Sequence, residues 1–162
     1  MLVLRYAALL ALVVWVGGLL VLGGIVAPSI FETLAARQIA ESRMVAGAVF
    51  GAILRKFSIL SLVAGGALLL TLVVRAVLGP RPRRLALRIV LLVLMIAATA
   101  YAALLVMPRI DALQRTIGTA PSNLPETDVR RVEFGRLHAL STGLQLVPIL
   151  GGLSLMYWEL KE

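Results

Sequence analysis

Four long stretches of this chain consist almost entirely of apolar residues, with the charged residues between them and at the ends. They cover about residues 6–31, 57–74, 89–107 and 137–158, and none of them contains Asp, Glu, Lys or Arg. Because a helix rises ~1.5 Å per residue, about 20 residues cross the ~30 Å hydrocarbon core of a bilayer. The pattern therefore predicts an all-α integral membrane protein, a four-transmembrane-helix bundle that forms a single membrane domain over residues 1–162.

The segment between the first two spans also has helical spacing. Arg37 and Glu41 are four residues apart, as in an ion pair on one helix face, and Ala and Gly recur over residues 46–52. Small residues of this kind allow a neighbouring helix to approach closely. We expect residues 34–52 to form an interfacial helix between spans 1 and 2 that leads into the second span.

Composition supports the membrane assignment and removes several other classes of protein. The 162 residues are 60% hydrophobic and 15% charged, with a mean hydropathy of +0.99, whereas about a quarter of the residues in a soluble domain are charged. The net charge of +8 fits cations placed beside anionic lipid headgroups, so we do not expect nucleic-acid binding. The chain has no Cys, which excludes disulfides, thiolate catalysis and iron–sulfur ligation.

The distribution of arginines predicts the orientation. Residues 75–88 hold five arginines and no acid, whereas the other two connections mix arginines with Asp and Glu. Because Lys and Arg concentrate in short cytoplasmic loops, we expect this turn and both termini to be cytoplasmic. The predicted location is the cytoplasmic (inner) membrane of a bacterium, as a multi-pass protein. The connections between spans 1 and 2 and between spans 3 and 4 then share the opposite face.

Uncharged polar residues gather in the fourth span. His138, Ser141 and Gln145 follow one another at intervals of three and four, so they lie on one face of a helix. Trp15 sits well inside the first span, where its indole N–H requires an acceptor. One interpretation is a polar cleft formed by these four residues. The other is that the stripe makes interhelical hydrogen bonds that fix helix packing, which is the commoner role of such residues.

No catalytic constellation or complete metal site is present in the sequence. Ser141 follows His138 by three positions but has no orienting acid nearby, so we predict no catalytic residues. A b-type haem normally takes two strong axial ligands and the chain has one His. We therefore predict no cofactor and no metal, with a haem or copper site left only as a weak alternative that would use His138 and Met107. The spans hold no acid that could carry a proton, which argues against an ion-coupled transporter.

Every span also carries a face of small residues. Such faces let helix backbones approach closely and favour a tight bundle over a wide pore. The glycines that we expect to pack against neighbouring helices are Gly17, Gly18, Gly24, Gly65, Gly66, Gly151 and Gly152.

Five short motifs, spread over nearly the whole chain, carry a family resemblance. They are Trp15-Val-Gly-Gly18, Val26-Ala-Pro-Ser-Ile-Phe31, Ala46-Gly-Ala-Val-Phe50, Met107-Pro-Arg-Ile110 and Phe134-Gly-Arg-Leu-His-Ala-Leu-Ser141. With them the chain resembles a bacterial membrane family of unknown function related to the eukaryotic transmembrane protein 205. The most specific of them is the Phe-x-x-Leu-His-x-x-Ser pattern that opens span four. One departure is Gln145, where the resemblance leads us to expect Asn.

The resemblance implies a four-span membrane protein without assigning it an activity. The sequence favours a non-enzymatic protein that binds a small hydrophobic molecule or a lipid in a cleft between its helices. An alternative is an accessory subunit that packs against a larger respiratory, photosynthetic or transport complex, or a homo-oligomer. A less favoured third class is a haem- or copper-binding membrane protein that uses His138. Partners beyond the lipid bilayer are therefore left open.

Overall fold

A computed structural model of the protein describes residues 2–79 and 82–161. The first span, Leu2–Ala36, is one long helix made of α1 (Leu2–Leu12), the π-helical turn η1 (Val13–Gly17), α2 (Gly18–Val21), a second π-helical turn η2 (Leu22–Val26) and α3 (Ala27–Ala36). The second span is α4 (Ser42–Leu78). The third consists of α5 (Leu85–Tyr101), π-helical η3 (Ala102–Val106) and α6 (Met107–Ile117). A short 3-10 turn, η4 (Pro121–Asn123), precedes the fourth span, α7 (Val129–Leu160).

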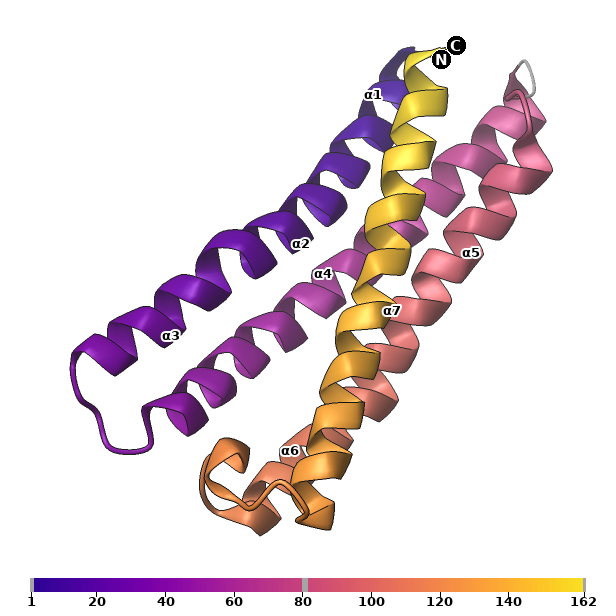
Figure 1. Ribbon diagram of the computed structural model, residues 1–162. Coiled ribbons are helices and arrows are strands. Elements are labelled where there is room, and N and C mark those ends of the chain that lie inside the picture. Colours follow the sequence, from indigo (N-terminus) through magenta and orange to yellow (C-terminus); the bar gives the residue numbers. More distant parts are fainter. Residues whose placement is uncertain (1, 80–81, 162) are drawn as a thin grey trace.

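These four helices are long and apolar enough to cross a membrane, which confirms the predicted all-α four-span bundle. Both termini lie at one end, together with the turn between α4 and α5 (Figure 1). The turn after α3 and the loop that contains η4 lie at the other end, so the protein has a terminal end and a loop end. Large apolar side chains such as Leu20, Val63 and Leu150 are exposed along the outside, as expected of a surface that faces lipid.

The connection between the first two spans differs from the expectation. Residues 34–52 do not form a separate interfacial helix. Instead α3 ends at Ala36, residues 37–41 form a turn, and α4 starts at Ser42 and continues into the membrane. No proline interrupts residues 42–78, so the ladder of backbone hydrogen bonds has no reason to break there. Arg37 and Glu41 lie in the turn, where Glu41 has a left-handed backbone (φ 53°), and they do not share a helix face.

Two prolines account for two of the three π-helical turns. A proline inside a helix donates no N–H, and its ring collides with the carbonyl group four residues earlier. For Pro28 and Pro108 those carbonyls belong to Gly24 and Leu104, which lie in η2 and η3. The wider π-helical turn gives each ring room, so both spans continue through the proline.

The core is concentrated toward the terminal half of the bundle. Leu12, Trp15, Leu68, Leu92 and Leu155 belong to one buried cluster that joins all four spans. Trp15 is completely buried. A cluster this continuous holds the spans together where the helices lie closest.

Only some of the small residues lie where helices approach one another. A Cβ atom on Gly65 would lie 2.8 Å from Ile96 Cγ1 and 2.9 Å from Trp15 Cζ3. A Cβ atom on Gly151 would lie 2.9 Å from Met95 Sδ, and Gly18 and Gly152 similarly face Phe57 and Val16. A Cβ atom on Gly17, Gly24 or Gly66 would meet no atom within 4 Å in the described part of the chain.

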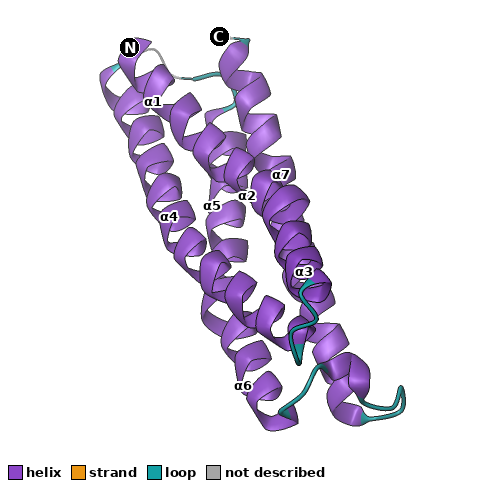
Figure 2. Ribbon diagram, turned by 90° about the vertical axis from the view of Figure 1, so that its left-hand side faces the viewer, coloured by secondary structure: helices purple, strands orange, loops and turns teal. Residues whose placement is uncertain are grey.

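The spans form two pairs that diverge toward the loop end. The first span packs against α4 through both α1 and α3, while α5 and α6 pack against α7. Figure 1 shows α3 running away from α7, although α1 and α7 lie side by side at the terminal end. Figure 2 shows the same helices from the side, running the length of the molecule. The divergence leaves space between the pairs at the loop end.

Candidate functional site

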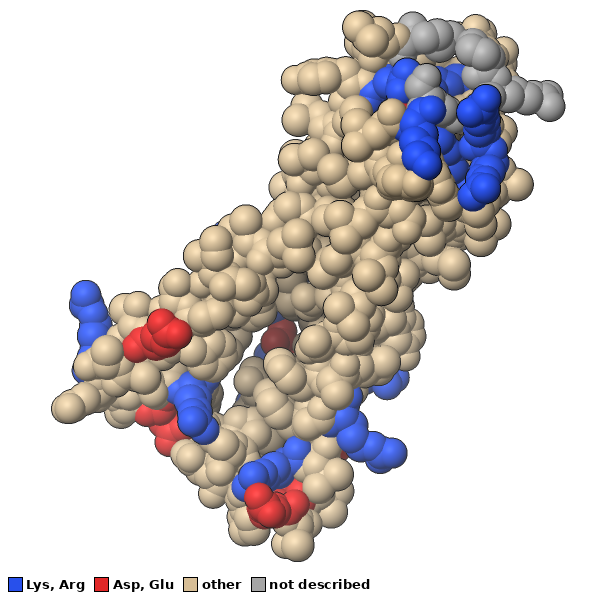
Figure 3. Space-filling model, turned by 45° about the horizontal axis from the view of Figure 1, so that its top comes forward, with Lys and Arg blue, Asp and Glu red and all other residues tan. Residues whose placement is uncertain are grey.

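A cavity of about 870 Å³ occupies the space between the two helix pairs at the loop end. The surface is hollowed between the arm formed by α3 with the start of α4 and the loop end of α6 and α7 (Figure 3). The lining is mainly apolar and includes several glycines: Gly23, Ala27, Phe31, Gly47, Phe50, Gly51, Leu54, Met107, Ile110, Phe134 and Gly135. The glycines on the α3 and α4 side leave volume that larger side chains would fill.

The polar stripe of α7 faces this cavity. His138, Ser141, Thr142 and Gln145 all line it. Trp15 does not, because it lines a separate chamber of about 20 Å³ on the inner side. Ser141 and Gln145 line both spaces. The structure thus brings three of the four predicted site residues to one cavity and places the fourth just beyond them.

The stripe does not make the interhelical hydrogen bonds that the packing interpretation expects. Within residues 2–79 and 82–161, the side chains of His138, Ser141 and Gln145 make no hydrogen bond. The His138 ring stacks on Phe134 one turn earlier, with centroids 6.1 Å apart and an interplanar angle of 10°. Thr142 bonds only locally, by donating to the carbonyl oxygen of His138 at 3.0 Å. The polar atoms of the other three side chains are therefore available to a molecule in the cavity.

Local interactions fix the start of α7 and hence the position of the stripe. Asp128 caps the helix by accepting a 2.8 Å hydrogen bond from the backbone N–H of Arg130. Hydrogen bonds from the side chain and backbone of Arg130 lower the pKa of Asp128 to about 2, so the cap is charged at neutral pH. Arg131 donates to the carbonyl oxygen of Leu124 at 2.6 Å and ties the helix to the preceding loop.

Charged side chains lie at the outer part of the cavity. Arg43, Asp111 and Arg131 contribute to its lining. Asp111 pairs with Arg55, whereas Arg43 makes no hydrogen bond or ion pair in the described part of the chain. Two guanidinium groups and one carboxylate give this region an excess of positive charge.

The two loops of this end are fastened together by Glu41. Its carboxylate accepts hydrogen bonds from Thr119 Oγ1 at 2.9 Å and from the backbone N–H of Ala120 at 3.0 Å. Ala120 and the two residues after it line the cavity. Glu41 therefore positions the loop that covers the outer end of the cavity.

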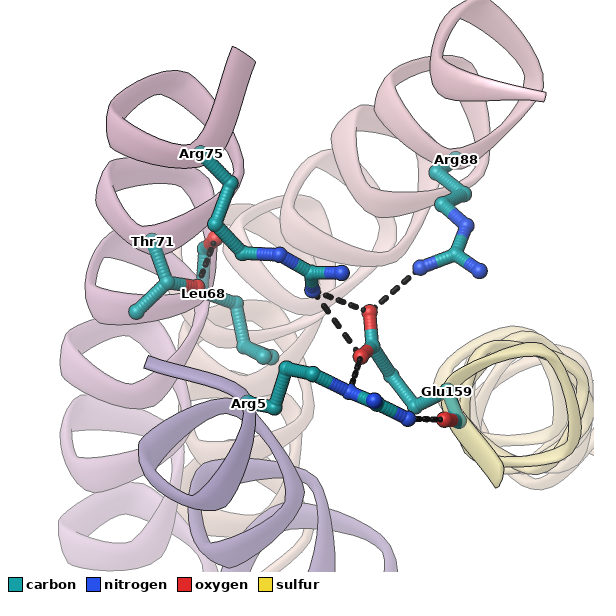
Figure 4. A network of polar contacts seen from close by, with 6 residues as sticks. All are labelled: Arg5, Leu68, Thr71, Arg75, Arg88 and Glu159. Atoms are coloured by element: carbon teal, nitrogen blue, oxygen red, sulfur yellow. Dashed lines mark hydrogen bonds and ion pairs between the residues drawn. The ribbon is translucent and has the colours of Figure 1, made fainter. Parts of the chain in front are cut away.

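A buried charge cluster that the sequence did not predict lies at the opposite end. The Glu159 carboxylate of α7 contacts Arg5 of α1, Arg75 of α4 and Arg88 of α5, so each span contributes one residue (Figure 4). Arg75 Nη1 donates to both carboxylate oxygens at 2.7 and 2.9 Å, and Arg5 Nε lies 3.8 Å from Oε2. The side chains of Glu159 and Arg88 are only 4% and 2% exposed.

The available signal was an acid, Glu159, directly after the fourth apolar run. The sequence predicts that Arg75 and Arg88 lie in the cytoplasmic turn between spans 2 and 3, and Glu159 directly follows the predicted fourth span. The helices continue past the predicted span ends, to Leu78 and from Leu85, and this places the arginines inside the bundle. A carboxylate directly after the fourth span, at the same end as several arginines, hints at an ion pair.

The weak metal candidates share the cavity but are not joined by other ligands. Met107 and His138 both line it. In the part of the chain that the structure describes, no three His, Asp or Glu side chains form a group that could hold a metal ion. The arrangement is therefore suited to binding through apolar contacts and uncharged polar groups.

A protein-family model matches residues 10–118 and thus covers most of the first span, the second and third spans, and three walls of the cavity. The α7 stripe lies outside the matched segment. No curated protein and no solved structure matches the chain. Because the match covers well over half of the sequence, the chain belongs to the family described as a domain of unknown function, DUF4149.

Proposed function

We propose that this protein is a non-enzymatic membrane protein that binds one lipid-like molecule in the cavity at its loop end. The main support is the α7 stripe: His138, Ser141 and Gln145 line a largely apolar cavity without hydrogen bonds of their own in the described chain. Ser141 is buried and Gln145 is half-buried. Polar groups away from water are normally hydrogen-bonded, so a bound molecule would supply the partners that these side chains lack. A volume of about 870 Å³ lies within the ~300–1,000 Å³ range of sites for single small molecules.

The lining fits an amphipathic molecule with an acidic head. Aromatic and aliphatic side chains such as Phe31, Phe50 and Ile110 suit an acyl chain. Arg43 lies at the first turn of α4 without an ion-pair partner in the described residues, and a carboxylate or phosphate would supply one. We assign the ligand to the class of long-chain acids and anionic lipids, with access from the bilayer between α3 and α7.

The same proposal includes the orientation of the protein. Among the described residues on the face shown in Figure 3, the Lys and Arg side chains of the terminal end gather without Asp or Glu, whereas those of the loop end are mixed with acids. This supports a cytoplasmic location for the termini in a bacterial inner membrane. The cavity then opens toward the outer leaflet. The proposal also includes a relation to the family of transmembrane protein 205, which the sequence motifs alone support.

The direct test uses Trp15 as a reporter. Trp158→Phe leaves Trp15 as the single tryptophan, and Trp15 lies beside the cavity yet is completely buried. Dibrominated stearic acid quenches indole fluorescence on contact or near contact. We expect saturable quenching at a molar ratio near one, in nanodiscs made of unbrominated lipid.

A matched pair of variants identifies the site. Gly51→Phe places a ring in the cavity, because Gly51 lines it and an added Cβ meets no atom within 4 Å. Gly66→Phe adds the same ring at an exposed position that lines neither space. Gly51→Phe should abolish the saturable quenching and Gly66→Phe should retain it. Equal quenching in both variants, or quenching that never saturates, would overturn the proposal.

A further inference from the structure

The inner chamber contains two buried polar groups that lack partners. Trp15 Nε1 and Ser61 Oγ have no hydrogen bond to any residue that the structure describes, and their residues are 0% and 1% exposed. Both residues line the chamber. Leaving a donor unsatisfied in such a place is costly, so the chamber requires an oxygen atom.

In the described chain, two other buried hydroxyl groups on α4 have hydrogen-bond partners, unlike that of Ser61. Ser58, one turn earlier on α4, also lines the chamber but donates to the carbonyl oxygen of Leu54 at 2.8 Å. Thr71 on the same helix donates to the carbonyl oxygen of Leu68 at 2.8 Å. Their hydroxyl groups are satisfied within the helix, whereas that of Ser61 is left for another group.

The chamber and the large cavity are adjacent. Leu54, Met107, Ser141 and Gln145 line both. About 20 Å³ holds one water-sized group and no more. A molecule stretched along the α7 stripe can therefore direct a single oxygen into the chamber while its chain stays in the cavity.

The chemistry of the two residues defines that oxygen. An indole N–H only donates, and a serine hydroxyl donates or accepts. Trp15 and Ser61 can thus both donate to a keto oxygen or to a hydroxyl oxygen. A charged group is disfavoured, because the remaining chamber lining is apolar or uncharged.

We propose that the ligand carries an uncharged oxygen on its chain, which Trp15 and Ser61 recognise in the inner chamber. This inference rests on the proposed function and specifies its ligand: an acid whose chain bears a keto or hydroxyl group. Arg43 would bind the acidic head, and the chamber would select the oxygen on the chain.

The test compares two acids that differ by one group, stearic acid and a stearic acid with a keto group in mid-chain. Calorimetric titration of the full chain should give about three- to tenfold tighter binding of the keto acid, the value of one net hydrogen bond. Trp15→Phe combined with Ser61→Ala should make the two affinities equal. In Trp158→Phe protein labelled with ¹⁵N, the keto acid alone should shift the Trp15 indole N–H resonance.

The possible failures are distinguishable. Equal binding of both acids, with an indole resonance that neither acid moves, would overturn the inference and leave the proposed function standing. Binding of neither acid would overturn both.

Discussion

Arg75 Nη1 lies 2.7 Å from Oε1 and 2.9 Å from Oε2 of Glu159, so one nitrogen bridges both oxygens of a buried carboxylate. Arg5 and Arg88 contact the same carboxylate. The packing of all four spans therefore depends on the Glu159 side chain, which the three arginines share. Because an unpaired charge inside a protein is expensive, the cluster makes the terminal end intolerant of change.

Glu159→Gln should lower the free energy of unfolding by about 3–5 kcal/mol, because it removes the charge that compensates buried guanidinium groups. The measurement is thermal or denaturant unfolding in detergent, followed by helical circular dichroism. Glu126→Gln is the matched control: Glu126 is 88% exposed and lies 3.4 Å from Arg131, so its loss should cost less than about 1 kcal/mol. Equal effects of the two substitutions would contradict a stabilising role for the cluster.

Gly65→Leu should destabilise the bundle by about 1–3 kcal/mol or prevent assembly, because the new side chain must displace both Trp15 and Ile96. Gly66→Leu, at the next position, meets no atom within 4 Å of its Cβ in the described structure and should be tolerated. Yield of monodisperse protein and the unfolding midpoint would compare them. A tolerated Gly65→Leu would contradict close packing of α4 against the first span.

Gln145→Leu separates the two interpretations of the polar stripe. If Gln145 stabilised the bundle through an interhelical hydrogen bond, its loss would cost about 1 kcal/mol. Because it makes none in the described chain, we expect the stability to change by less than about 0.5 kcal/mol. Binding of dibrominated stearic acid should weaken at the same time. Unchanged binding with reduced stability would favour the packing role.

The native chain has no Cys, so single cysteines can report its orientation. Ser122→Cys marks the loop end and Arg84→Cys the terminal end; both residues are exposed. With a membrane-impermeant maleimide on cells whose outer membrane is permeable, we expect Ser122→Cys to react. Arg84→Cys should react only after the inner membrane is opened. The reverse pattern would place the termini outside.

The helices and the α7 stripe could be predicted from the sequence because both depend on local periodicity. An apolar run of membrane length predicts a span wherever its neighbours lie, and the spacing of His138, Ser141 and Gln145 fixes a common face. The direction in which that face points depends on how the spans diverge, which no local pattern contains. The cavity itself could therefore not be derived from the sequence.

The Glu159 cluster was missed for a related reason. A residue at the end of an apolar run is exposed or buried according to which helices extend beyond it, and α4 and α5 extend further than their apolar runs. Trp15 lies in the separate inner chamber, and this placement likewise depends on how closely Gly65 lets the first span approach α4. These are properties of helix pairs, and a single sequence gives them only indirectly.

The π-helical turns have an evolutionary consequence. Such a turn closes its hydrogen bond over one residue more than an α-helical turn, so it behaves as a one-residue insertion that rotates everything beyond it by about 100°. Because η2 and η3 precede α3 and α6, the faces that these helices turn toward the cavity are set by a count of residues. Deletion of one residue in either turn would rotate the helix beyond it and so change which side chains line the cavity. The span and its hydrophobicity would stay intact. Relatives that differ in length at these two places would then share the fold and differ in what they bind.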